Sequence, residues 1–412
     1  MIETYYTRSR DTLGWQALAW RLYTLALATS FFVMIEPALT DLLLLLAVPC
    51  LALAGLKPVR LVGGVELTGI IMFIWFTFLS LVMVEQYFIV SARAAVIEVY
   101  MLIIFLMTAY WVRHYGDQAF RAVILLLIFG GICTSLIGLL AWLDLIPNSD
   151  IFFRDEFRSR IKSTFKDPNV LGPYLILPLL GGLWAVVERE RRRMLFLAAT
   201  GIVALGLLLT FSRGAWIHAI VTIFIFFMAL LNHRKTAYPT LLAGCLVLCC
   251  AGLVMFIFAD DIFGAMTGSY FSKRLSLQSY DSERFDNIFT ALFLIFDYPF
   301  GVGPNQVVFR FGIEPHNTFV VFALNNGIFA CLGFAILYFA AAYRCLVKTL
   351  ERRDGWLKYA FILAVMCGLF ILMNVVGSIH WRHLFVTLGL AYGNYTQNGL
   401  MGLEAPGAKP AA

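Results

Sequence analysis

The sequence predicts an all-α, polytopic membrane protein, and two observations carry that prediction. Apolar runs of roughly 17–25 residues, the length that crosses a bilayer as a helix, recur along the whole chain. Hydrophobic residues make up 61% of the 412 residues and charged residues only 14%, whereas a soluble protein carries about 25% charged residues. We therefore expect a single integral membrane domain over residues 1–412.

About twelve transmembrane helices are expected, each with limits that hold to within a few residues. The apolar runs that predict them lie at 16–34, 38–55, 65–84, 94–112, 119–143, 170–187, 195–211, 214–231, 239–258, 316–343, 357–375 and 381–396.

The connections between these runs alternate in basic content. If the chain starts in the cytoplasm, every cytoplasmic connection contains Lys or Arg, from Lys57 near the start to Arg353 near the end. The opposite connections, which contain Glu36 and Glu85, are poorer in basic residues. The positive-inside rule therefore predicts that both termini lie in the cytoplasm.

One long hydrophilic segment, residues 260–315, separates the ninth and tenth runs and is expected on the side of the membrane opposite the cytoplasm. Within it, Ser282 to Asp297 reads as an amphipathic helix, because apolar residues recur at helical spacing. These residues are Phe285, Ile288, Phe289, Leu292 and Phe296. A helix of this kind between two spans is expected to lie along the membrane surface.

Basic residues also gather at the outer face, where the orientation rule does not require them. They occur in 144–169, in the tight turn 210–214, in the long segment 260–315 and in 380–383. The net charge of +6 does not indicate a nucleic-acid partner, because most Lys and Arg residues lie in short loops between apolar runs. Cations that converge on one face instead predict a site for an anion.

Two arginines are the first candidates. Arg213 lies between two apolar runs with almost no loop, so it is either an anchor at the membrane boundary or a clamp for an anion such as phosphate. Arg158, Arg160 and Lys162 alternate, so an extended segment would place them on one face. The alternative is a solvated loop whose positive charge Asp155 and Glu156 balance.

His316 stands where the long segment meets the tenth run. An unperturbed pKa of about 6.5 lets a histidine accept a proton near neutral pH. A lone histidine at a helix start is more often structural, but the basic segments on the same face favour a catalytic role. His218, inside a run, is expected to be a packing or hydrogen-bonded residue, and Glu98 is expected either to pair with Arg93 or to join the site.

No metal or cofactor is expected. Asp281 and Glu283 resemble an acidic metal-binding pair, but they open the predicted amphipathic helix, where acidic residues also favour the helix dipole. The eight cysteines show no metal-ligand spacing with histidines and are expected to pack inside the helices.

Five stretches, taken in this order, resemble the O-antigen ligase / Wzy-type polymerase family of bacterial membrane glycosyltransferases. They are Arg160–Asn169, Thr210–Trp216, Arg284, Tyr298–Pro304 and Pro315–Phe319. The resemblance covers roughly residues 155 to 390. It departs from the family pattern at Ser163, where glycine is usual, and at Asn326, where an acidic residue often precedes the glycine.

The resemblance implies an inverting, metal-independent transfer of a saccharide from a polyprenyl-diphosphate carrier to an acceptor hydroxyl, at the periplasmic face of the bacterial inner membrane. The acceptor would be a glycan or lipid A–core, with membrane lipids as further partners and no nucleic acid. His316 would be the general base, and Arg160 and Arg213 would hold the diphosphate. The implied substrate-binding residues are Arg160, Lys162, Arg213, Arg284, Asn169 and Asn317.

Ligation and polymerisation are not distinguished by these motifs. A transporter or flippase of lipid-linked saccharide is the main alternative, and it predicts inverted repeats and charges near the membrane midplane. A metal-dependent transferase that uses Asp281 and Glu283 is a second. Arg274, Arg382 and His380 are left without a role, because each could join the site or pair with nearby acidic residues.

Overall fold

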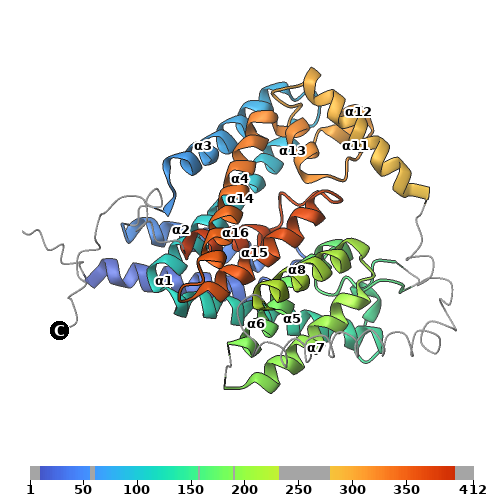
Figure 1. Ribbon diagram of the computed structural model, residues 1–412. Coiled ribbons are helices and arrows are strands. Elements are labelled where there is room, and N and C mark those ends of the chain that lie inside the picture. The colour runs from blue at the N-terminus through green and yellow to red at the C-terminus, as the bar shows by residue number, and fades with distance from the viewer. Residues whose placement is uncertain (1–9, 56–60, 156–157, 189–190, 232–278, 395–412) are drawn as a thin grey trace, which may run out of the picture.

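The computed structural model describes residues 10–55, 61–155, 158–188, 191–231 and 279–394, and it shows helices joined by loops (Figure 1). Seven helices in this described part are long and apolar enough to cross a membrane. They are α3 with the 3-10 turn that extends it (Gly64–Met83), α4 (Phe88–Tyr115), α5 (Asp117–Trp142), α6 (Pro168–Val187), α8 (Arg213–Leu231), α14 (Ile328–Glu351) and α15 (Trp356–Met373).

The remaining helices are shorter or more polar. They are α1 (Arg10–Ala28), α2 (Leu39–Leu53), α7 (Arg193–Leu209), α11 (Ser279–Asp297), α12 (Val307–Phe311), α13 (Thr318–Asn326) and α16 (Arg382–Gly393). The all-α polytopic membrane fold is therefore confirmed. The total of about twelve spans stays a prediction, and the ninth run, 239–258, lies outside the described residues.

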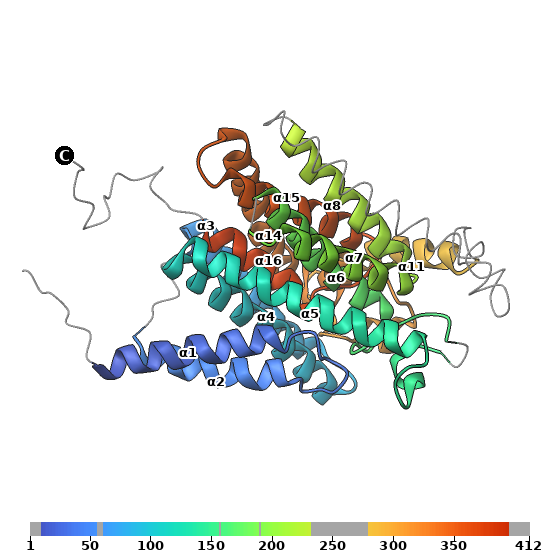
Figure 2. The same cartoon turned by 90° about the horizontal axis from the view of Figure 1, so that it is seen from below.

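The middle of the bundle is formed by α6 and α15, whose most apolar stretches are 89% and 78% buried. Helix α6 packs against α5, α7 and α8, and α15 packs against α8 and α14. At one edge of the molecule α1 and α2 lie side by side (Figures 1 and 2). Because every backbone polar group in a bilayer needs a partner, this arrangement of packed helices is what such an apolar sequence can form.

Small residues set the closest helix contacts. A Cβ at Gly333 of α14 would lie 2.5 Å from the carbonyl oxygen of Gly69 in α3. A Cβ at Gly389 of α16 would lie 2.3 Å from Cβ of Thr108 in α4. Close backbone approach of this kind stabilises helix pairs in membranes, where apolar burial alone supplies little driving force.

The predicted tenth span, 316–343, is wrong as a single helix, because the chain breaks at Gly327 into α13 and α14. Gly327 has φ +89°, a conformation that residues with a Cβ rarely adopt. The loop after α11 packs into the break, with the Val302 amide donating to the Leu324 carbonyl (2.9 Å) and the Ile328 amide donating to the Pro299 carbonyl (2.9 Å). Sequence analysis did not predict this break, because the apolar run 316–343 continues through Gly327 without a charged residue.

We expect Gly327→Ala to destabilise the protein by about 1–3 kcal/mol, the usual cost of a strained backbone position. Besides the positive φ, an added Cβ would meet the backbone of Phe300 at 2.8 Å. The measurement is the unfolding temperature of the detergent-solubilised chain. Gly201→Ala in α7 is the matched control, because a Cβ there has open space within 4 Å, and it should leave that temperature equal or higher. Equal behaviour of the two variants would contradict the argument.

The predicted amphipathic helix is confirmed as α11, which starts three residues earlier than expected and ends at Asp297 as expected. One face, with Ala291 and Ile295, is buried in a small cluster with residues of α13. The other face exposes Phe289, Phe293 and Phe296, which are 61%, 74% and 81% exposed. A helix with one packed face and exposed phenylalanines is suited to a membrane surface, so its placement there stays a prediction.

Candidate active site

A cavity of about 1620 Å³ lies where several elements meet. Its walls come from the α1–α2 loop, α4, the loop before α6, the start of α8, α11, the segment before α13 and the segment between α15 and α16. Among the predicted site residues, the cavity brings together Arg160, Arg213, Arg284, Asn169 and His316. These residues lie far apart in the sequence, since Arg160 precedes the sixth predicted span and His316 begins the tenth.

Lys162 and Asn317 are not among the residues that line this cavity. Lys162 is half-buried on the loop before α6. Asn317 is the N-cap of α13, where its Oδ1 accepts from the amides of Phe319 (3.0 Å) and Val320 (3.1 Å). It thus fixes the start of the helix that follows His316.

Arg160 connects two segments that carry the predicted anion site. It is only 6% exposed. Its Nε donates to the Thr210 carbonyl (3.0 Å), and its Nη2 donates to Oδ1 of Asn169 (2.7 Å). The Ser212 hydroxyl donates to the same Asn169 oxygen (3.1 Å). The loop before α6 is therefore tied to the turn before α8, and Arg213, the first residue of α8, lies next to this junction.

Local sequence explains how Asn169 is held. Asp167 is the N-cap of α6, with its Oδ1 accepting from the Asn169 amide at 2.6 Å, and Pro168 takes the first helical position, which suits proline. Arg154 donates to the other carboxylate oxygen of Asp167 (2.5 Å). The first turn of α6 is thus fixed by capping before any substrate is present.

Two non-glycine residues near the arginines have left-handed backbone. Phe211, in the turn before α8, has φ +49°, and Ser163 has φ +46°. Such positions cluster at functional sites, where surrounding contacts hold them. Ser163 stands where the family that the sequence resembles usually has glycine, and glycine adopts this conformation without strain. Its hydroxyl donates to the Thr134 carbonyl (2.6 Å), which holds the loop in this path.

The expectation that Arg158 shares a face with Arg160 does not hold. Arg158 has φ +51°, so the segment is not extended there and the alternation of side chains is lost. Its guanidinium instead pairs with Asp150 (2.6 Å) and Asp144 (3.2 Å). Arg158 therefore belongs to a charge-balanced part of the loop, with Asp144 and Asp150, and not Asp155, as the ion-pair partners of its guanidinium.

His316 is half-buried just before the N-cap of α13. Burial and the nearby Arg284 lower its pKa below the usual 6.5, while Glu314 acts in the opposite direction. The imidazole is accordingly neutral at neutral pH and can accept a proton. The Thr318 hydroxyl donates to the Val376 carbonyl (2.7 Å), which ties this segment to the one between α15 and α16.

Glu98 does not pair with Arg93. Its carboxylate is buried and accepts from Nδ2 of Asn326 (2.5 Å), and Arg93 instead lies 4.0 Å from Glu36. Glu98 does line the cavity. His218 is 1% exposed and is not among the lining residues, in agreement with its reading as a packing residue.

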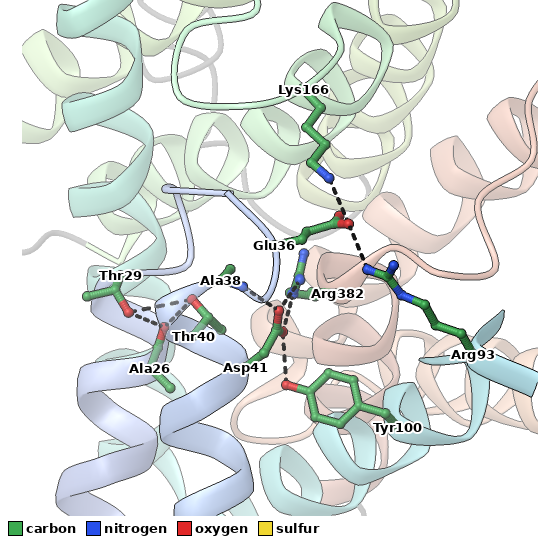
Figure 3. A network of polar contacts seen from close by, with 10 residues as sticks. All are labelled: Ala26, Thr29, Glu36, Ala38, Thr40, Asp41, Arg93, Tyr100, Lys166 and Arg382. Atoms are coloured by element: carbon green, nitrogen blue, oxygen red, sulfur yellow. Dashed lines mark hydrogen bonds and ion pairs between the residues drawn. The ribbon is translucent and has the colours of Figure 1, made fainter. Parts of the chain in front are cut away.

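A second polar wall of the cavity was missed by sequence analysis. Figure 3 shows two carboxylates of the α1–α2 region, Glu36 and Asp41, which hold three cations. Glu36 pairs with Lys166 (2.7 Å) and lies near Arg93, and Asp41 pairs with Arg382 (2.6 Å). Asp41 and Arg382 are 341 residues apart, so no local pattern linked them. His380 also lines the cavity, and Arg274 lies outside the described residues.

In the part of the chain that the structure describes, no group of three or more His, Cys, Asp or Glu side chains is arranged to hold a metal ion. The side chains of Asp281 and Glu283 lie outside that part.

Residues 197–335 match the model of a family described as O-antigen ligase. The matched region contains Arg213, Arg284 and His316 and begins after Arg160. None of the curated proteins compared with the chain matches it.

Proposed function

We propose that the chain belongs to the O-antigen ligase family of glycosyltransferase-type membrane enzymes, whose model matches residues 197–335, and that it transfers a saccharide from a polyprenyl-diphosphate carrier to an acceptor hydroxyl. The observation that carries the proposal is the cavity, which brings Arg160, Arg213 and His316 to one place. Two cations suit a diphosphate, and a neutral imidazole suits removal of a proton from a hydroxyl.

In the proposed mechanism the arginines bind the diphosphate of the donor. Arg160 is fixed by Thr210 and Asn169, and Arg213 lies at the start of α8 beside that junction. As the bond between the anomeric carbon and the diphosphate oxygen breaks, the bonding electrons leave with the diphosphate. Guanidinium groups fixed in advance stabilise this developing charge without reorganising.

His316 acts on the acceptor. Its imidazole takes the proton of the acceptor hydroxyl while the hydroxyl oxygen forms the new bond to the anomeric carbon. Direct displacement of this kind inverts the anomeric centre, and the two arginines take the part that a metal ion plays in other transferases. Retention of configuration would contradict the first statement. Activity that is lost in EDTA and restored by Mg²⁺ would contradict the second and favour Asp281 and Glu283.

The pH dependence of transfer should follow the lowered pKa of His316. Only the neutral imidazole accepts a proton, so kcat/KM should persist below pH 6.5 and fall as pH drops through the lowered pKa. Removing a nearby cation raises that pKa, so Arg284→Gln should move the acid limb to higher pH. Glu314→Gln should move it to lower pH. Shifts in the same direction in both variants would contradict this assignment.

We propose that the protein lies in the bacterial inner membrane as a single domain with both termini in the cytoplasm. Residues 260–315 and the cavity then face the periplasm. The charge distribution of the loops supports this orientation. Reporter fusions at the C-terminus and within 260–315 would test it.

Analysis of lipid-linked and surface glycans in a strain that lacks the protein tests the proposed function. Finished long chains trapped on the carrier would indicate a ligase. Single repeat units delivered to the surface, without long chains, would indicate a polymerase. Lipid-linked glycan that accumulates on the cytoplasmic side would favour a transporter and remove the roles given to Arg160, Arg213 and His316.

A further inference from the structure

Arg382, the first residue of α16, lines the cavity and forms a bidentate ion pair with Asp41. It lies outside the five sequence stretches on which the family resemblance rests. Its Nε donates to Oδ1 of Asp41 (2.8 Å), and its Nη2 donates to Oδ2 of Asp41 (2.6 Å) (Figure 3). The pair therefore uses one edge of the planar guanidinium. Paired bonds of this kind fix the orientation of an arginine as well as its position.

Asp41 is itself saturated. Its Oδ1 also accepts from the Tyr100 hydroxyl (3.1 Å), and its Oδ2 also accepts from the Ala38 amide (3.0 Å). With the two bonds from Arg382, the carboxylate accepts four hydrogen bonds, which matches its roughly four lone-pair sites. Asp41 has no acceptor left for a ligand, so its role at this wall is to orient Arg382.

Arg382 has N–H donors that its ion pair with Asp41 does not use. A guanidinium carries five N–H groups, and only two of them donate to an acceptor within the residues that the structure describes. The side chain is 22% exposed and lines the cavity. The edge formed by Nη1 and Nη2 is thus the one that a ligand in the cavity can reach.

The surrounding charge favours an anion. Three cations, Lys166, Arg93 and Arg382, share two carboxylates, Glu36 and Asp41, which leaves one positive charge in this network. All five residues line the cavity. Pockets that bind drug-sized ligands have volumes of roughly 300–1,000 Å³, so a cavity of about 1620 Å³ has room for groups beyond one diphosphate.

We propose that Arg382 binds an oxyanion of the substrate, with Asp41 as its positioning residue. The oxyanion is either a phosphate of the lipid carrier or an acidic group on the saccharide, since both present the paired oxygens that this guanidinium edge fits. The proposal rests on the proposed function, because it assumes that this cavity holds the lipid-linked saccharide.

Direct binding to the full-length chain in detergent tests the proposal without requiring transfer. Two probes separate the sources: farnesyl diphosphate for the carrier and a glucuronate-containing oligosaccharide for the saccharide. Arg382→Gln should weaken one of them roughly 10- to 100-fold, the effect of losing charge-assisted hydrogen bonds. Unchanged binding of both probes would overturn the proposal. Failure of the unchanged protein to bind farnesyl diphosphate would instead count against the proposed function.

A second variant separates binding from a purely structural ion pair. Arg382→Lys keeps a cation that can pair with Asp41 but lacks the second edge of donors. It should retain the unfolding temperature and still weaken the same probe about tenfold or more. Asp41→Asn should weaken that probe less than Arg382→Gln does. If Arg382→Lys binds both probes as the unchanged protein does, Arg382 only ties α16 to α2 and the proposal falls.

Discussion

His316→Ala should lower kcat for saccharide transfer by about 10²–10⁴-fold, the usual contribution of a positioned general base. The imidazole is half-buried in the cavity wall, and its lowered pKa keeps it neutral at neutral pH. In the proposed mechanism the residue acts on the acceptor hydroxyl, so binding of the donor should change little. The measurement is steady-state transfer by the purified chain, with donor binding measured separately.

The matched control is His114→Ala. His114 is exposed near the end of α4 and is not among the residues that line the cavity. It should therefore leave kcat within about twofold of the unchanged protein. A His316→Ala variant that loses donor affinity in step with kcat would show that His316 holds the fold or the donor, and not the proton of the acceptor.

Apart from the break at Gly327, sequence analysis located the long apolar helices that the structure describes, because bilayer length and apolarity constrain them directly. It also located the residues of the site that stand at the ends of apolar runs. Arg213 and His316 are polar side chains at such junctions. Because burying a polar group next to the membrane interior is costly, a residue of this kind there often has a function. Both lie at the cavity, as their positions in the chain indicated.

The rest depended on contacts between distant segments. Asp41, Tyr100 and Arg382 come from three different runs, and each alone resembles an ordinary loop or membrane-boundary residue. The path of the loop before α6 was equally hidden, because it depends on left-handed backbone at Arg158 and Ser163. The prediction that Arg158 shares a face with Arg160 assumed an extended segment, and it was wrong because the backbone is not extended at Arg158.

Arg213→Gln should lower kcat/KM by about 10²–10³-fold. This is the usual effect of removing one hydrogen-bond donor that stabilises charge in the transition state, here the charge that develops on the leaving diphosphate. Arg213 is the cleaner test of the two arginines. Arg160 is 6% exposed and donates to the Thr210 carbonyl and to Asn169, so Arg160→Gln also leaves buried acceptors unsatisfied. That loss should lower stability by about 1–3 kcal/mol in addition to any effect on transfer.

The double variant tests whether the two arginines act on one group. If both bind the same diphosphate, Arg160→Gln and Arg213→Gln together should lower kcat/KM by less than the product of their separate effects. Arg310→Gln is the control, since Arg310 pairs with the exposed Glu85 (2.7 Å) and is not among the cavity-lining residues. It should leave transfer nearly unchanged, because exposed ion pairs contribute little. Strictly multiplicative losses would mean that Arg160 and Arg213 contact different parts of the substrate, and the shared diphosphate site would have to be abandoned.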